Sequence, residues 1–143
     1  MQTRGFSLIE LLIAISIILI VGAAITTSYT AARGTGEPLH DSYMYVDALR
    51  EATLRARSME YDTDWGVKIT GGNTIVFSGS SYASRTASRD HAYDSSDTLT
   101  VGGVTEIVFA KFSGTPNTSG TTTFQNKYAT TSVNVSATGV ISY

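Results

Sequence analysis

The sequence RGFSLIELL at residues 4–12 begins an apolar run that continues to Ile25. Glu10 is the only charged residue between Phe6 and Ile25. A helix of about 20 residues is ~30 Å long, which matches the hydrocarbon core of a bilayer. A helix that is apolar on every side belongs in lipid or inside protein. The run therefore predicts a helix that inserts in a membrane.

A secretory signal peptide is one interpretation of this run. It would use Arg4 as its basic region and the small residues at 22–24 as its cleavage site. The apolar run is long for such a signal, however, and a carboxylate deep in a bilayer costs about 2.5–3.5 kcal/mol or more. Since acidic residues in membrane segments are typical of functional sites, Glu10 is the first candidate functional residue.

The same residues resemble the class III signal of type IV prepilins and of the pseudopilins of type II secretion. Gly5 stands where the family has glycine before the cleavage site, Phe6 follows it, and Glu10 is the fifth mature residue. The resemblance implies cleavage between Gly5 and Phe6 by an inner-membrane prepilin peptidase, followed by methylation of the Phe6 amino group to N-methylphenylalanine. It also implies that Glu10 meets the Phe6 amino group of a neighbouring subunit during assembly. The alternative for Glu10 is a charge that snorkels to the membrane interface.

Glycine and proline punctuate the chain after the apolar run, at Gly34, Gly36 and Pro38. Apolar residues then recur at steps of three and four, which predicts an amphipathic helix whose apolar face packs on a sheet. The predicted face consists of Leu39, Tyr43, Val46, Leu49, Thr53, Ala56 and Met59. Glu51 and Arg55 are spaced for an ion pair on this helix.

The second half of the chain is typical of β-structure. One hairpin is predicted over 65–77 and a second over 98–112, the latter turning at Gly102 and Gly103. Three further short strands are predicted at 121–125, 131–136 and 140–143, whereas residues 78–97 show no convincing element. These elements predict an α+β fold in which a long N-terminal helix packs on an antiparallel β-sheet, as in pilins.

The expected organisation divides the chain into four parts. They are a prepilin leader at 1–5, a hydrophobic transmembrane and assembly helix at 6–32, a break at 33–38, and a globular domain at 39–143 with its helix at 39–60 and its sheet at 64–143.

Composition narrows the functional classes. Ten Lys and Arg against 12 Asp and Glu give a net charge of −2, which does not favour general nucleic-acid binding. The absence of cysteine excludes disulfides and thiolate chemistry, and no enzyme motif occurs, so we expect neither catalysis nor a cofactor. Asp90, Asp94 and Asp97 are weak candidates for calcium ligands, and a solvated loop is the alternative.

The later segments resemble the H-type minor pseudopilins (GspH/FimT). DNA-uptake members of that group carry Arg after the final Gly, but here Val140 follows Gly139. Lys127 is the only basic residue after Ser113, although Arg85 and Arg89 could form a small patch, so DNA is an unlikely partner.

The resemblance implies a structural minor subunit of a type II secretion pseudopilus, which serves protein export. The alternative is a minor type IV pilus subunit for adhesion, motility or DNA uptake. The expected partners are other pilin or pseudopilin subunits, the prepilin peptidase, inner-membrane lipid and the inner-membrane assembly platform. We expect a single-pass protein of the bacterial inner membrane, with its globular domain outside the cytoplasm, that later joins a filament.

Overall fold

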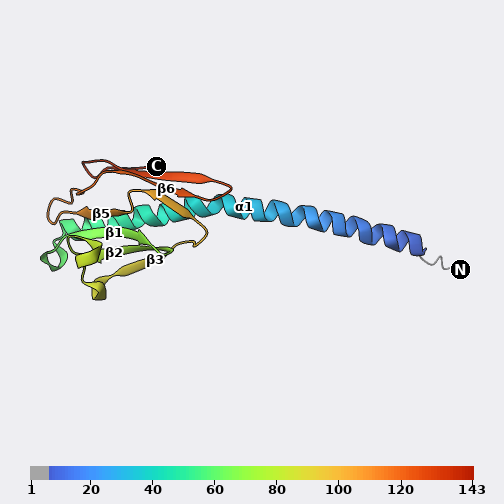
Figure 1. Cartoon of the computed structure of the whole chain (residues 1–143), viewed down its shortest axis with the longest axis horizontal. Helices are drawn as coiled ribbons and strands as arrows, with labels where there is room; N and C mark the ends of the chain where they lie inside the picture. Colours follow the sequence, from blue (N-terminus) through green and yellow to red (C-terminus); the bar gives the residue numbers. More distant parts are fainter. Residues whose placement is uncertain (1–6) are drawn as a thin grey trace. The chain divides into compact units, whose positions relative to one another are not determined.

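The computed structural model describes residues 7–143, apart from the side chains of residues 24–28 and 30–33. The predicted leader at 1–5 lies outside the described residues. The chain forms two compact units, Met1–Arg33 and Gly34–Tyr143. A single helix, α1, extends over Leu8–Arg57 and contributes to both units (Figure 1). All strands belong to the second unit.

The expected break at 33–38 is wrong, because Gly34, Gly36 and Pro38 all lie inside α1. A proline within a helix has no amide hydrogen, so Pro38 leaves the carbonyl of Gly34 without its usual partner. The side chain of Asn126 supplies the missing donor, since its Nδ2 lies 2.7 Å from the Gly34 oxygen. Tyr128 packs against the same turn, and a Cβ at Gly34 would overlap its ring. The loop that holds both side chains therefore stabilises a helical turn that local propensity disfavours.

The first sheet has the strand order β3-β2-β1-β5 and is antiparallel throughout. Its strands are β1 (Trp65–Thr70), β2 (Asn73–Ser78), β3 (His91–Asp94) and β5 (Glu106–Phe109). The predicted first hairpin is confirmed as β1–β2. Its turn uses Gly71 and Gly72 at φ 55° and 74°, a left-handed pair that glycine adopts without strain.

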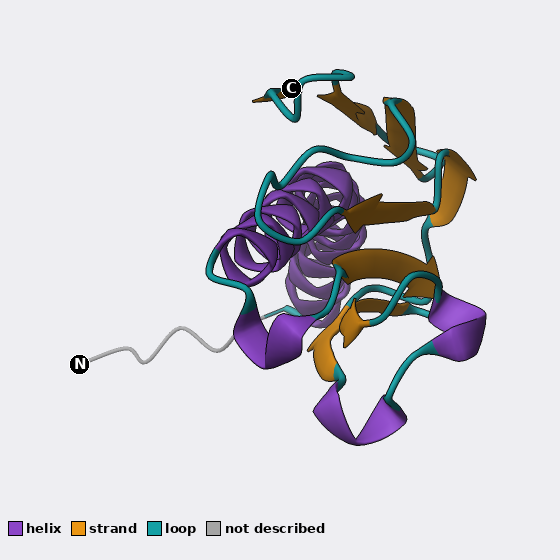
Figure 2. Cartoon of the chain, turned by 90° about the vertical axis from the view of Figure 1, so that its left-hand side faces the viewer, coloured by secondary structure: helices purple, strands orange, loops and turns teal. Residues whose placement is uncertain are grey.

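The second sheet has the order β4-β6-β7-β8 and is also antiparallel. Its strands are β4 (Thr100–Gly103), β6 (Gly120–Gln125), β7 (Thr130–Val135) and β8 (Ile141–Ser142). The three predicted C-terminal strands are thus confirmed, with boundaries shifted by a residue or two. Figure 2 shows the strands curving around one side of the helix.

The predicted second hairpin is wrong, and the single predicted sheet is two. β4 pairs with β6, whereas β5 pairs with β1 in the other sheet. Gly103 does not turn the chain back, because it lies in β4 opposite Thr122. Residues 78–97 are also more ordered than expected, since they contain β3 and two short 3₁₀ helices, η2 (Tyr82–Ser84) and η3 (Ala87–Arg89).

The core of the second unit forms where α1 packs on the strands. The predicted apolar face is correct at Val46, Leu49 and Ala56, but Leu39 and Met59 are almost half exposed. Tyr43 is exposed as well. The buried face is rotated by about one position and includes Ser42, Tyr45, Ala48, Leu49, Ala52 and Ala56. Small side chains in this set let the helix lie close to the sheet, which a search for large apolar residues does not detect.

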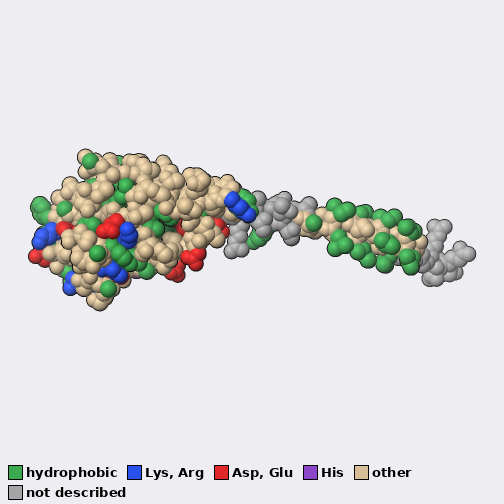
Figure 3. All heavy atoms as spheres, in the orientation of Figure 1, with side chains coloured by type: hydrophobic (Ala, Val, Ile, Leu, Met, Phe, Trp, Pro, Cys, Tyr) green, Lys and Arg blue, Asp and Glu red, His purple; other side chains and the backbone are tan. Residues whose placement is uncertain are grey.

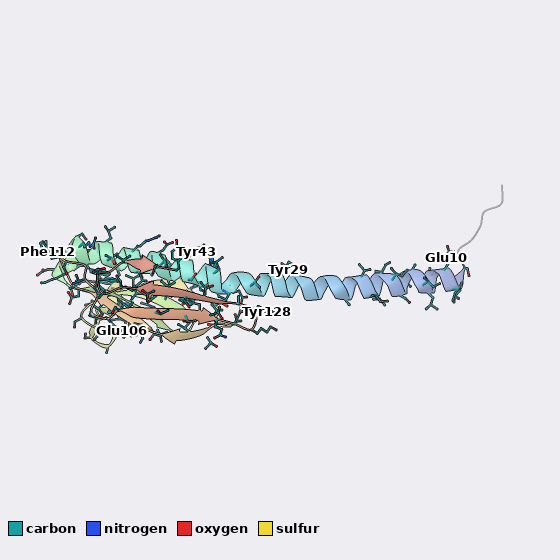
Figure 4. The ribbon with its side chains drawn as sticks, turned by 90° about the horizontal axis from the view of Figure 1, so that it is seen from above. Glu10, Tyr29, Tyr43, Glu106, Phe112 and Tyr128 are labelled. Atoms are coloured by element: carbon teal, nitrogen blue, oxygen red, sulfur yellow. The ribbon has the colours of Figure 1, made fainter. Side chains whose placement is uncertain are left out.

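The C-terminal end of α1 is capped from a distance. The backbone amide of Phe112 donates to the carbonyl of Ala56 at 2.9 Å. Phe112 has φ 70°, and Met59, Tyr61 and Asp62 in the adjoining segment also have positive φ. Tyr61 and Asp62 belong to the short helix η1 (Glu60–Asp62). The Phe112 side chain is 76% exposed and is labelled at the end of the globular unit in Figure 4.

Candidate functional site

The candidate site lies in the first turn of α1. Ser7 precedes the helix, and its carbonyl accepts the amides of Glu10 and Leu11 at 3.0 and 3.1 Å. The amino end of a helix carries a partial positive charge, which stabilises a carboxylate in the first turn by about 0.3–1 kcal/mol. Glu10 occupies such a position, at the N-terminal end of the helix (Figure 4).

The Glu10 side chain is exposed. Among the residues that the structure describes, none donates a hydrogen bond or forms an ion pair with its carboxylate. Within the described residues, this carboxylate therefore has no positively charged partner. Gly5 and Phe6, the predicted cleavage and methylation residues, lie outside the described residues.

Large aliphatic side chains surround Glu10 and continue along the helix. Each is at least half exposed: Leu8, Ile9, Leu11, Leu12, Ile13, Ile15, Ile17, Ile18, Leu19, Ile20 and Val21. Figure 3 shows these apolar side chains as a green segment of the first unit. Contiguous apolar surface of this kind marks contact with protein or membrane. Ser16 does not interrupt it, because its hydroxyl donates to the Leu12 carbonyl at 2.7 Å.

Within the described residues, no helix combines the length and the hydropathy needed to cross a membrane. The predicted transmembrane span is not found among them.

The calcium candidates do not form a site. Asp90 accepts a hydrogen bond from Nε of Arg85 at 2.7 Å, and this contact raises the pKa of Arg85. Asp94 ends strand β3, and Asp97 lies in the loop that follows. In residues 7–143 no three acidic or histidine side chains are grouped so that they could hold a metal ion. The weak interpretation of Asp90, Asp94 and Asp97 as calcium ligands is therefore not supported.

The two arginines of the same loop stack on aromatic rings. The guanidinium of Arg85 lies 3.8 Å from the ring centre of Tyr82, and that of Arg89 lies 3.9 Å from the ring centre of Tyr61. These contacts hold both cations against the protein, so the suggested basic patch consists of side chains that already have partners.

Sequence reasoning missed a polar cluster around Glu51. The predicted Glu51–Arg55 pair is confirmed, with a separation of 2.5 Å. Glu51 also contacts Nδ1 of His91 at 3.0 Å and accepts a hydrogen bond from the hydroxyl of Tyr93 at 2.5 Å. Burial and the bond to Glu51 raise the pKa of Tyr93 to about 12. The alternation of His91 and Tyr93 along one strand is the only signal that could have placed them on one face.

Comparison with protein-family models gives one finding for this chain, and it falls on the candidate site. Residues 1–26 match the prokaryotic N-terminal methylation motif. Comparison with curated proteins and with solved structures gives no significant match. The motif supports a subunit of the type IV pilin or pseudopilin family, with processing by prepilin peptidase and assembly with other pilin subunits. It also implies a membrane-anchored N-terminus with a periplasmic domain.

Proposed function

We propose that the protein is a structural minor pseudopilin. The N-terminal methylation motif supports a pilin or pseudopilin subunit, and we propose the H type from the resemblance of the later segments. Prepilin peptidase cleaves it between Gly5 and Phe6, and it then assembles into a type II secretion pseudopilus for protein export. The observation that carries the proposal is Glu10, an exposed carboxylate in the first helical turn, within the matched motif and amid exposed aliphatic side chains.

The proposed location is the bacterial inner membrane before assembly. Lipid would cover the aliphatic surface of α1, and the globular unit would lie outside the cytoplasm. The assembly platform of the inner membrane would then transfer the subunit to the filament, where helices of other subunits replace lipid as the apolar surroundings.

Charge pairing explains how Glu10 directs this transfer. Cleavage frees the α-amino group of Phe6, and the corresponding group of a neighbouring subunit is the partner that we propose for Glu10. A buried carboxylate that pairs with a cation is tolerable, whereas an unpaired one is strongly disfavoured. The role is structural rather than catalytic and requires no cofactor or DNA.

A minor type IV pilus subunit is the second candidate. The same matched motif supports it, because both assemblies begin with a methylated N-terminus and an apolar helix. Deletion of the gene separates the two roles: loss of protein export indicates a pseudopilus, and loss of pili or twitching motility indicates a pilus.

The test uses Glu10→Ala, with Glu10→Asp as a matched variant that retains the charge. We expect Glu10→Ala to insert and be cleaved, because removing the carboxylate lowers the cost of insertion, but to be absent from sheared filaments. Intact mass of the wild-type protein should show loss of residues 1–5 and gain of one methyl group. A mature N-terminus near Ala24, or normal incorporation of Glu10→Ala, would overturn the proposal.

A further inference from the structure

A cavity of about 280 Å³ opens inside the globular unit, where α1 meets both sheets. Its apolar wall consists of Ile69, Leu99, Val101 and Phe124, and the β1–β2 turn closes one side. This volume is close to the lower limit of small-molecule sites, which have about 300–1,000 Å³. The cavity is therefore larger than a single ion requires and has the size of a small organic group.

Asp41 contributes a buried carboxylate to this cavity. The residue is only 3% exposed, and its Oδ2 accepts the backbone amide of Ser96 at 2.9 Å. Among the side chains and backbone groups that the structure describes, no other group donates a hydrogen bond to this carboxylate or forms an ion pair with it. Buried carboxylates are normally paired with a cation or bound to a metal, because an isolated charge loses its hydration. The cavity thus contains an acid whose counter-charge the described part of the chain does not provide.

A second carboxylate reinforces the negative charge. Asp97 is exposed, lines the rim of the same cavity and lies against Gly72, where a Cβ would overlap its Oδ1. Glycine at position 72 therefore leaves space for this carboxylate as well as supplying the turn. None of the residues that line the cavity is lysine, arginine or histidine. Two acids without a base favour a cation.

The chemistry of the wall decides what kind of cation fits. A calcium ion takes six to eight oxygen ligands. Only two acids line this cavity, and among the described residues no three acidic or histidine side chains are grouped so that they could hold a metal ion. An ammonium or guanidinium group on an apolar stem suits both parts of the cavity. We propose that this cavity binds such an alkyl cation, with its charged end at Asp41 and its stem along Leu99, Val101 and Phe124. A lysine or arginine side chain of another protein and a small free amine share this chemistry.

This inference does not depend on the proposed function, and the test is made on the ¹⁵N-labelled full chain in non-ionic detergent micelles. The probes are n-butylammonium and its neutral analogue n-butanol, and the reporter is the Ser96 amide that donates to Asp41. We expect saturable shifts of the Ser96 and Gly72 signals with n-butylammonium, and at least tenfold weaker binding of n-butanol. Equal binding of the two probes would overturn the proposal, as would saturable shifts of the same signals by Ca²⁺ alone.

Three variants locate the binding. Asp41→Asn preserves the shape of the side chain and should weaken n-butylammonium binding at least tenfold. Leu99→Phe fills the cavity from its apolar wall and leaves Asp41 unchanged, and it should weaken binding similarly. Asp47→Asn is the matched control, because Asp47 is an exposed acid on the same helix, and it should bind like wild type. Unchanged binding in both cavity variants would contradict the assignment.

A lysine-containing peptide distinguishes the two sources of the cation. Binding at least tenfold tighter than n-butylammonium supports a side chain of another protein as the occupant. Equal binding supports a small free amine.

Discussion

Replacement of Asn126 by alanine should destabilise the globular unit by about 3 kcal/mol. Its Nδ2 donates to the Gly34 carbonyl at 2.7 Å, and its Oδ1 accepts the amides of Tyr128 and Ala129 at 2.9 and 3.0 Å. Each of these three bonds contributes about 1 kcal/mol net. For a unit of this size, the loss corresponds to a fall in Tm of about 10–15 °C.

The stability of the globular unit can be measured by following the fluorescence of Trp65 during unfolding. Trp65 is the only tryptophan of the chain and is fully buried in the core, so its fluorescence reports unfolding of the strands and helix around it. Asn134→Ala is a matched control, because the exposed Asn134 side chain donates one bond to Thr121. We expect that control to change stability by less than about 0.5 kcal/mol.

A double-mutant cycle with Pro38→Ala tests the cause. Alanine at position 38 regains an amide that can donate to the Gly34 carbonyl. In the Pro38→Ala background, Asn126→Ala should then lower the free energy of unfolding by about 1 kcal/mol less than it does in the wild type, because the Gly34 carbonyl keeps a donor. An equal cost in the two backgrounds, within about 0.3 kcal/mol, would refute the view that Asn126 compensates for the proline.

Further predictions concern Gly34, the boundary of the domain and alkaline pH. Gly34→Val should lower Tm because its Cβ would overlap the Tyr128 ring, and adding Tyr128→Ala should restore part of the loss, as thermal melts would show. A fragment of residues 34–143 should melt cooperatively, unaffected by EDTA, and above a fragment of residues 39–143, which lacks the Gly34 contact. In the folded state the pKa of Tyr93 is raised from 10.0 to about 12. The contribution of Tyr93 to the free energy of unfolding is therefore fully present below pH 10 and is lost as pH rises through about 12. Urea titrations should therefore show a smaller loss of stability between these pH values in Tyr93→Phe; the pKa of Tyr45 is also raised by burial, so some alkaline loss should remain.

Local signals in the sequence predicted local structure well. The β1–β2 hairpin follows from two glycines between alternating strands, and the Glu51–Arg55 pair follows from helical spacing. Glu10 could be identified as a candidate functional residue because the motif around it is contiguous in the sequence. Each of these features depends on residues only a few positions apart.

Features that depend on distant partners were not predictable in this way. The partner of β4 begins about 20 residues later, and β5 pairs with a strand that lies some 40 residues earlier. The stability of a helical Pro38 depends on Asn126, which no local pattern connects to it. The cavity at Asp41 is likewise lined by residues that range from position 41 to position 124. From the sequence alone, Asp41 could not be distinguished from the other polar residues of an amphipathic helix.

The cap on α1 has a consequence for evolution at position 112. Phe112 holds the helix end through its backbone amide alone, while its side chain is largely exposed. Glycine or asparagine would suit the positive φ better, so retaining phenylalanine costs the fold some stability. Variation at this position can therefore alter the outer surface of the globular unit while leaving the cap intact. Selection at position 112 can therefore act on contacts between this side chain and other molecules, independently of the backbone hydrogen bond that caps the helix.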